Sequence, residues 1–410
     1  MRKITLERLP DALIELPENP RVVVSGNAAT PWVLLKAFDK QVSHYRLHML
    51  NAQIGIPDRD GVVHETVFVG AGMRHSTRLD YVPCRLSLVP KLLSTARPAD
   101  VVLLHTSKAY DGKVSLGIEV NVIPAVIATV KQRGGLIIGQ VNEQMPYTFG
   151  DGEIDLDVFD YIIEVDEPVD AHPIPPLTDI AKEIGDRIAF KVLDGSTLQM
   201  GIGAIPNAFL SAVAQERTNL KVWTEMFSDG ILELETNGRL DKETPIRASF
   251  AFGSQELYRW MDRNPRIHML KTEKTNNPAK VADQPMMTSV NAALQVDLLD
   301  QANASRIGNK IYSGFGGSTD FIVGAMHAKG GQAFIALPSW HPKADCSTIV
   351  PLLTEPTTHF QHSAIVTEQG MAAMFGRSQR EQASSLIANC AHPNAREYLW
   401  SEGRRLGFVE

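Results

Sequence analysis

RVVVS at Arg21–Ser25 and PWVLLKAF at Pro31–Phe38, joined by the turn Gly26-Asn27, set the pattern for the first half of the chain. DVVLLH at Asp100–His105 and LIIGQV at Leu136–Val141 are two further apolar runs of this kind. Continuous apolar strands that alternate with helices are typical of a parallel sheet covered on both faces. The sequence of the first half of the chain therefore predicts an α/β fold.

A proline-rich stretch interrupts this pattern. EVDEPVDAHPIPPLT at Glu164–Thr178 excludes a regular helix or a central strand, because proline lacks an N–H and has a fixed φ. Beyond it, DIAKEIGDRIAFKV at Asp179–Val192 has helical spacing, and the strand–turn–helix order resumes at Thr197. We therefore predict two α/β domains with mostly parallel sheets, at residues 1–175 and 176–410.

Net charge and cysteine placement limit the partners and the compartment. The 410 residues include 40 Lys and Arg and 47 Asp and Glu, and the net charge of −7 provides no basic field for nucleic acid or an acidic membrane surface. Cys84, Cys346 and Cys390 are far apart and form no CxxC, so neither a disulfide framework nor a zinc ribbon is implied. The stretch MRKITLERLPDALIELPENP lacks the roughly 7–15-residue apolar core of a secretory signal, and no apolar run approaches the roughly 20 residues that span a bilayer. We expect a cytoplasmic protein that binds neither nucleic acid nor a membrane.

The first candidate site is a glycine turn, LQMGIGAIP at Leu198–Pro206. A strand that enters a glycine turn and then a helix lets backbone N–H groups approach a phosphate or a thioester. The dinucleotide fingerprint is absent, since Pro206 occupies the place of its third glycine. A tight turn with no ligand is the alternative interpretation.

Glu225 lies in KVWTEMFSDG, where an apolar strand is expected to end. In open α/β sheets ligands bind outside the carboxyl ends of strands, and a carboxylate there can act as a nucleophile, a base or a cation ligand. A glutamate that caps a helix or forms a salt bridge is the alternative.

A third glycine cluster is YSGFGGSTDF at Tyr312–Phe321. A helix that follows it would present free N–H groups able to stabilise an oxyanion or a phosphate. A purely structural turn is the alternative here too.

Other motifs point away from common enzyme classes. GxSxG, GxxxxGK[ST] and HExxH are absent. The acidic run between Asp151 and Asp160 lacks EF-hand spacing and is more typical of a solvated surface. His341, Asp345 and Cys346 have no second ligand cluster, so we predict no metal site.

Ten motifs taken together resemble the acetyl-CoA hydrolase/CoA-transferase family, which includes 4-hydroxybutyrate and butyrate CoA-transferases. In order they are SLG, VNEQMPYTFGDG, DGSTLQMGIGAIPNA, TEMFSDG, NNP, VNAALQVDL, YSGFGGSTDF, STIVP, VTEQG and AHPNAREYL, between residues 115 and 399. The resemblance implies two CoA-transferase-like α/β domains with the active site between them, and a homodimer or a higher homo-oligomer.

The resemblance also implies roles for individual residues. Glu225 corresponds to the family's nucleophile, which becomes a glutamyl-CoA thioester, Asn276 to an active-site asparagine, and Gly317 to an oxyanion donor through its N–H. The implied CoA-binding residues are Gly201, Ile202, Gly203, Ala204, Ile205, Leu294, Ser313, Gly314, Gly316, Gly317 and Lys343.

This chemistry implies no prosthetic group, because acyl-CoA and a carboxylic acid are both substrates. A CoA-transferase for short-chain acids is our leading interpretation. An acyl-CoA hydrolase that uses the same site is the first alternative. A CoA-binding protein without turnover is the second, since Gln295 replaces a glutamate of many relatives and SWHPKADCSTIVP departs from their usual motif.

Overall fold

The computed structural model describes residues 2–172, 176–355, 357 and 361–410, and its contacts divide the chain into two compact units. Unit 1 comprises Met1–Pro173, Pro245–Thr275 and Ile311–Gly316, and unit 2 comprises Ile174–Thr244, Asn276–Lys310 and Gly317–Glu410. The predicted boundary lies directly after residues 173–175, which are outside the described part of the chain.

This division differs from the predicted ranges 1–175 and 176–410, because two later segments of the chain also belong to unit 1. In the first, β15 (Ile246–Ala248) and β17 (Ile267–Met269) form a parallel sheet with β9 (Phe149–Gly150). In the second, Gly314 pairs with Phe68. Backbone pairing with earlier residues of unit 1 therefore explains why both segments belong to it.

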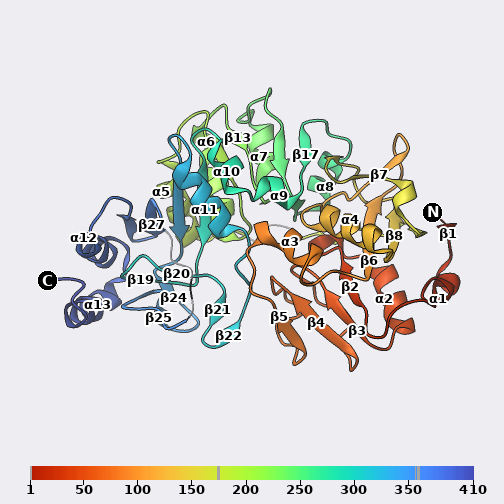
Figure 1. Ribbon diagram of the computed structural model, residues 1–410. Coiled ribbons are helices and arrows are strands. Elements are labelled where there is room, and N and C mark those ends of the chain that lie inside the picture. Colours follow the sequence, from red (N-terminus) through yellow and green to blue (C-terminus); the bar gives the residue numbers. More distant parts are fainter. Residues whose placement is uncertain (1, 173–175, 356, 358–360) are drawn as a thin grey trace. The chain divides into compact units, whose positions relative to one another are not determined.

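An eight-stranded sheet forms the centre of unit 1, in the order β1-β11-β8-β6-β2-β3-β4-β5, and its neighbouring strands are parallel (Figure 1). Its strands are β1 (Arg2–Lys3), β2 (Arg21–Val24), β3 (Tyr45–His48), β4 (Val62–Thr66), β5 (Leu79–Tyr81), β6 (Val101–Ser107), β8 (Leu136–Asn142) and β11 (Tyr161–Val165). The apolar runs quoted above become β2, β6 and β8, so the predicted parallel α/β sheet is confirmed.

Side chains of β2 alternate between the two faces of this sheet. Val22 and Val24 belong to a buried cluster that includes Phe38 of α2 (Trp32–Gln41). Val23, between them, points to the opposite face. The other helices of unit 1 are α1 (Leu9–Ala12), α3 (Val89–Ser94), α4 (Ile123–Arg133), α8 (Gln255–Met261) and α9 (Thr272–Thr275).

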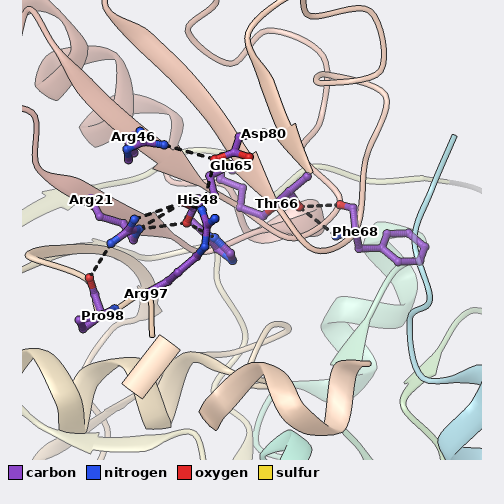
Figure 2. Close-up of polar contacts among 10 residues, drawn as sticks. Arg21, Arg46, His48, Glu65, Thr66, Phe68, Asp80, Arg97 and Pro98 are labelled. Carbon is purple, nitrogen blue, oxygen red and sulfur yellow. Dashed lines mark hydrogen bonds and ion pairs between the residues drawn. The ribbon is translucent and has the colours of Figure 1, made fainter. Parts of the chain in front are cut away.

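Glu65 of β4 is a fully buried carboxylate held by basic side chains (Figure 2). Arg21 Nε and His48 Nδ1 donate to its Oε1 at 3.0 and 3.1 Å. Arg97 Nη1 donates to its Oε2 at 2.6 Å and also contacts Asp80 at 3.2 Å. Burial raises the pKa of Glu65, but the hydrogen bonds and charges of His48 and Arg21 outweigh burial and lower the pKa to about 2. Glu65 is therefore ionised and joins β2, β3 and β4.

A second parallel sheet forms the centre of unit 2, in the order β13-β12-β18-β23-β27-β28, with only its last pair antiparallel. Its strands are β12 (Thr197–Gln199), β13 (Lys221–Val222), β18 (Thr288–Ala292), β23 (Gln332–Ala336), β27 (Ala364–Thr367) and β28 (Gly370–Ala373). Its helices are α5 (Asp179–Ala189), α6 (Ala204–Glu216), α7 (Gly230–Thr236), α10 (Pro278–Ala282), α11 (Ser318–His327), α12 (Gln379–Ser385) and α13 (Pro393–Arg405). Among the described residues, no helix combines the length and the apolar character needed to cross a membrane.

Replacing Glu65 by Gln should destabilise the protein by roughly 3–5 kcal/mol, because Arg21, His48 and Arg97 lose the buried anion that they contact. The lowered pKa of Glu65 stabilises the fold above the usual carboxyl pKa of 4.5, and this contribution is lost as the pH falls toward 2. The difference between wild type and Glu65→Gln should therefore shrink between pH 4.5 and 2. Urea unfolding followed by circular dichroism measures both effects.

Glu164→Gln is the matched control, because its ion pair with Lys3 is about half exposed and such pairs contribute little. Equal stability losses in the two variants would contradict the prediction.

Candidate functional site

Glu225 lies in a bend three residues beyond β13, next to the glycine turn that follows β12. The predicted strand therefore ends earlier than expected, at Val222. Thr224 is fully buried and fixes the bend, since its Oγ1 accepts from Met200 N at 2.9 Å and donates to Met226 O at 2.8 Å. The parallel pairing of β12 and β13 thus brings Glu225 close to the turn that begins at Gly201.

Asn276 and Gly317 converge on the Glu225 carboxylate. Asn276 is fully buried, and its Nδ2 donates to Glu225 Oε2 at 2.7 Å. A Cβ on Gly317 would overlap both Glu225 Oε2 and Asn276 Nδ2. Only glycine therefore fits where α11 begins, and unit 2 alone assembles these three residues.

The environment of Glu225 favours its neutral form. Burial raises the pKa of Glu225, the hydrogen bond from Asn276 opposes this, and the charge of Asp320 raises it further, to about 7. A carboxylate with such a pKa is present in both protonation states near neutral pH. It can therefore act as a desolvated nucleophile.

Asp320 was not among the residues predicted from the sequence. It is 1% exposed and lies in the first turn of α11, three residues after Gly317. The signal was present in GGSTDF, where an acidic residue follows the glycines at the spacing of one helical turn.

The predicted strand, glycine turn and helix at residues 198–206 are present. Gly201, Ile202 and Gly203 connect β12 to α6, which begins at Ala204 and Ile205. Gly203 has a φ of 115°, a conformation that L side chains rarely adopt. Ile202 is 49% exposed, and the first-turn N–H groups of a helix have no intrahelical acceptors. The turn therefore presents donors at an exposed position.

The third glycine cluster is divided between the two units. Ser313, Gly314 and Gly316 belong to unit 1, whereas Gly317 belongs to unit 2. Within unit 1, Ser313 O accepts from Val69 N at 2.8 Å, and Gly316 O accepts from Leu86 N at 3.0 Å. The backbone of this segment is therefore fixed by unit 1.

Leu294 and Lys343 lie elsewhere in unit 2. Leu294 N donates to Asn303 O at 2.8 Å, just before β19 (Gln295–Asp297). Lys343 is exposed, in the turn between β24 (Trp340–His341) and β25 (Cys346–Ser347). Neither residue is the hydrogen-bond partner or the charged neighbour of Glu225 described above.

The acidic run and the His341 segment make other contacts. Asp151 accepts from Lys274 Nζ at 2.6 Å and from Lys271 N at 3.1 Å. Asp345 accepts from Trp340 Nε1 at 3.1 Å. In the ranges that the structure describes, no three His, Cys, Asp or Glu side chains gather as a group that could hold a metal ion.

Comparison with known proteins identifies the family to which this chain is similar. Residues 12–173 match the acetyl-CoA hydrolase/transferase N-terminal domain, and residues 253–403 match the C-terminal domain. The chain is 35% identical to the 4-hydroxybutyrate coenzyme A transferase of Clostridium kluyveri, over 96% of both chains.

Solved structures agree with this result. RipA from Yersinia pestis has a TM-score of 0.92 and 27% identity, over 100% of this chain and 98% of that one. The 4-hydroxybutyrate CoA-transferase of Porphyromonas gingivalis has a TM-score of 0.82 and 30% identity, over 99% of this chain and 98% of that one. The chain belongs to the acetyl-CoA hydrolase/transferase family of enzymes.

Proposed function

We propose that the protein is a CoA-transferase that moves CoA between an acyl-CoA and a short-chain carboxylate, of the acetate, butyrate or 4-hydroxybutyrate type. The observation that carries the proposal is the Glu225 carboxylate, which accepts from Asn276 Nδ2 at 2.7 Å and lies against Gly317. A desolvated carboxylate with a raised pKa suits nucleophilic attack on a thioester, and family membership supports CoA as the carrier.

Glu225 attacks the carbonyl carbon of acyl-CoA, and the C–S bond breaks to give a mixed anhydride and a bound CoA thiolate. The thiolate then attacks the Glu225 carbonyl, which releases the first acid as a carboxylate and leaves a glutamyl-CoA thioester. An acceptor carboxylate repeats these steps in reverse. Each half-reaction conserves charge, so no proton, electron or prosthetic group is required.

Asn276 and Gly317 have separate roles in this scheme. The Asn276 amide orients the nucleophilic oxygen, and the Gly317 N–H donates to the oxyanion that forms at each addition step. The turn formed by Gly201, Ile202, Gly203, Ala204 and Ile205 binds CoA through backbone donors. We assign Leu294, Ser313, Gly314, Gly316 and Lys343 to CoA as well, on the basis of the family resemblance.

The covalent intermediate provides the decisive test. Incubating wild type with acetyl-CoA or butyryl-CoA and no acceptor should add the mass of CoA to the protein, less one water, at Glu225. Intact mass spectrometry and peptide mapping detect this adduct, and Glu225→Ala should not form it. Full exchange activity in Glu225→Ala would overturn the proposal.

The same preparation separates transfer from hydrolysis. A transferase releases little free CoA until acetate is added and then forms acetyl-CoA from another acyl-CoA. Rapid CoA release without any acceptor would identify a hydrolase that uses the same site.

Gly317→Ala should reduce kcat for CoA exchange by at least about a hundredfold, because the new methyl group displaces Glu225 and Asn276 from the reacting position. Steady-state exchange assays measure this loss. Gly238→Ala is the control: a Cβ there meets open space at a φ of 63°, so it costs stability without touching the site. Similar kcat losses in both variants would contradict the expected role of Gly317.

The acid limb of kcat/KM should have an apparent pKa of about 7, because only ionised Glu225 attacks the thioester. Asn276→Ala should move this limb to higher pH, since the lost hydrogen bond favours the ionised form. Exposed Asn389 provides the control variant, Asn389→Ala. An acid limb that stays in place in Asn276→Ala would show that the amide does not act on Glu225.

A further inference from the structure

One face of α11 packs against the segment that carries Asn276. A Cβ on Gly317 would overlap Glu225 and Asn276, and a Cβ on Gly324 would overlap the side chain of Val281 in α10. Residues three and four apart share a face of a helix. Asp320 is three residues after Gly317 and four before Gly324, so it lies between these two close contacts.

Its position on α11 makes Asp320 a charged neighbour of Glu225. Asp320 is 1% exposed and occupies the first turn of α11, where the helix dipole favours an anion. Asn276 supplies a neutral amide, and Gly317 supplies only backbone. Asp320 therefore adds a negative charge beside Glu225, and this charge raises the pKa of Glu225 in addition to the larger effect of burial.

We propose that the negative charge of Asp320 favours the conversion of Glu225 from its carboxylate form into the neutral glutamyl-CoA thioester. The inference rests on the proposed function and adds a positioning residue to it, since Asp320 acts through Glu225. In the net half-reaction, acyl-CoA and the Glu225 carboxylate give the thioester and a free carboxylate. The charge of Glu225 leaves with the released acid, and the repulsion from Asp320 ends.

This mechanism links two measurable quantities. Protonation of Glu225 and formation of the thioester both remove the same negative charge beside Asp320. The repulsion therefore raises the pKa of Glu225 and favours the thioester by the same factor. Above the pKa of Glu225, replacing Asp320 by a neutral residue should lower the equilibrium constant for thioester formation. It should lower this constant by the same factor by which it raises the acid dissociation constant of Glu225.

The experiment compares wild type with Asp320→Asn and Asp320→Ser, two neutral variants of different shape. The acid limb of kcat/KM gives the pKa of Glu225. Acid-quenched mass spectrometry at fixed ratios of butyryl-CoA to butyrate gives the equilibrium constant for the thioester at pH 8.5, on the order of one unit or more above that pKa. We expect the acid limb to fall by about one unit and the equilibrium constant to fall about tenfold, which is the same factor.

Two variants serve as controls. Asp320→Glu keeps the charge and should retain most of both effects, whereas Asp283→Asn removes an exposed carboxylate at the end of α10 and should change neither. The inference is overturned if a folded neutral variant leaves the acid limb in place, or if the two factors differ beyond error. Wild type without any thioester would instead overturn the proposed function, and this inference with it.

Discussion

The desolvation of the partly buried Glu225 carboxylate is the constraint on which the arrangement of unit 2 around the site depends. Removing a carboxylate from water costs on the order of several kcal/mol unless other groups compensate. Asn276 provides one hydrogen bond, and its amide is itself fully buried. Because Glu225 and Asn276 occupy the space beside α11, the helix must begin at a residue without a side chain, which is Gly317.

The cost of desolvating Glu225 is only partly compensated, and this affects its reactivity. A carboxylate held by several cations would be stable and unreactive, whereas Glu225 accepts from one neutral donor and is repelled by the charge of Asp320. Its ionised form is therefore high in free energy, and any reaction that neutralises it is favoured. Acylation and thioester formation are such reactions. The raised pKa and the proposed reactivity are thus two consequences of the same environment.

Local sequence patterns predicted the parallel α/β class and the strands β2, β6 and β8, because continuous apolar runs are typical of strands in a sheet that is covered on both faces. The return of residues 245–275 to unit 1 was not predictable in this way. It depends on β15 and β17, which are only three residues long and pair with a two-residue strand, β9. Such short segments have no recognisable alternation, and their pairing is decided by distant parts of the chain.

The candidate site shows a similar limit. The motifs pointed to Glu225, Asn276 and Gly317, but no motif states that a hydrogen bond of 2.7 Å joins the first two or that the charge of Asp320 raises the pKa of Glu225. Lys343 stays a prediction, since it lies in an exposed turn and its contact with CoA rests on the family resemblance. Chemistry-bearing residue types can be read from a sequence, whereas the environment that tunes them arises only from packing.

Glu65 and Glu225 show how far that environment can separate the pKa values of identical side chains. Glu65 receives hydrogen bonds from Arg21, His48 and Arg97, and its pKa is lowered to about 2. Glu225 receives one bond from Asn276, and its pKa is raised to about 7. Both are glutamates at strands or bends of parallel sheets, so the number and charge of their partners account for the difference. Basic partners make Glu65 a permanent anion suited to holding strands together, whereas the single neutral donor at Glu225 fits the nucleophilic role proposed for it.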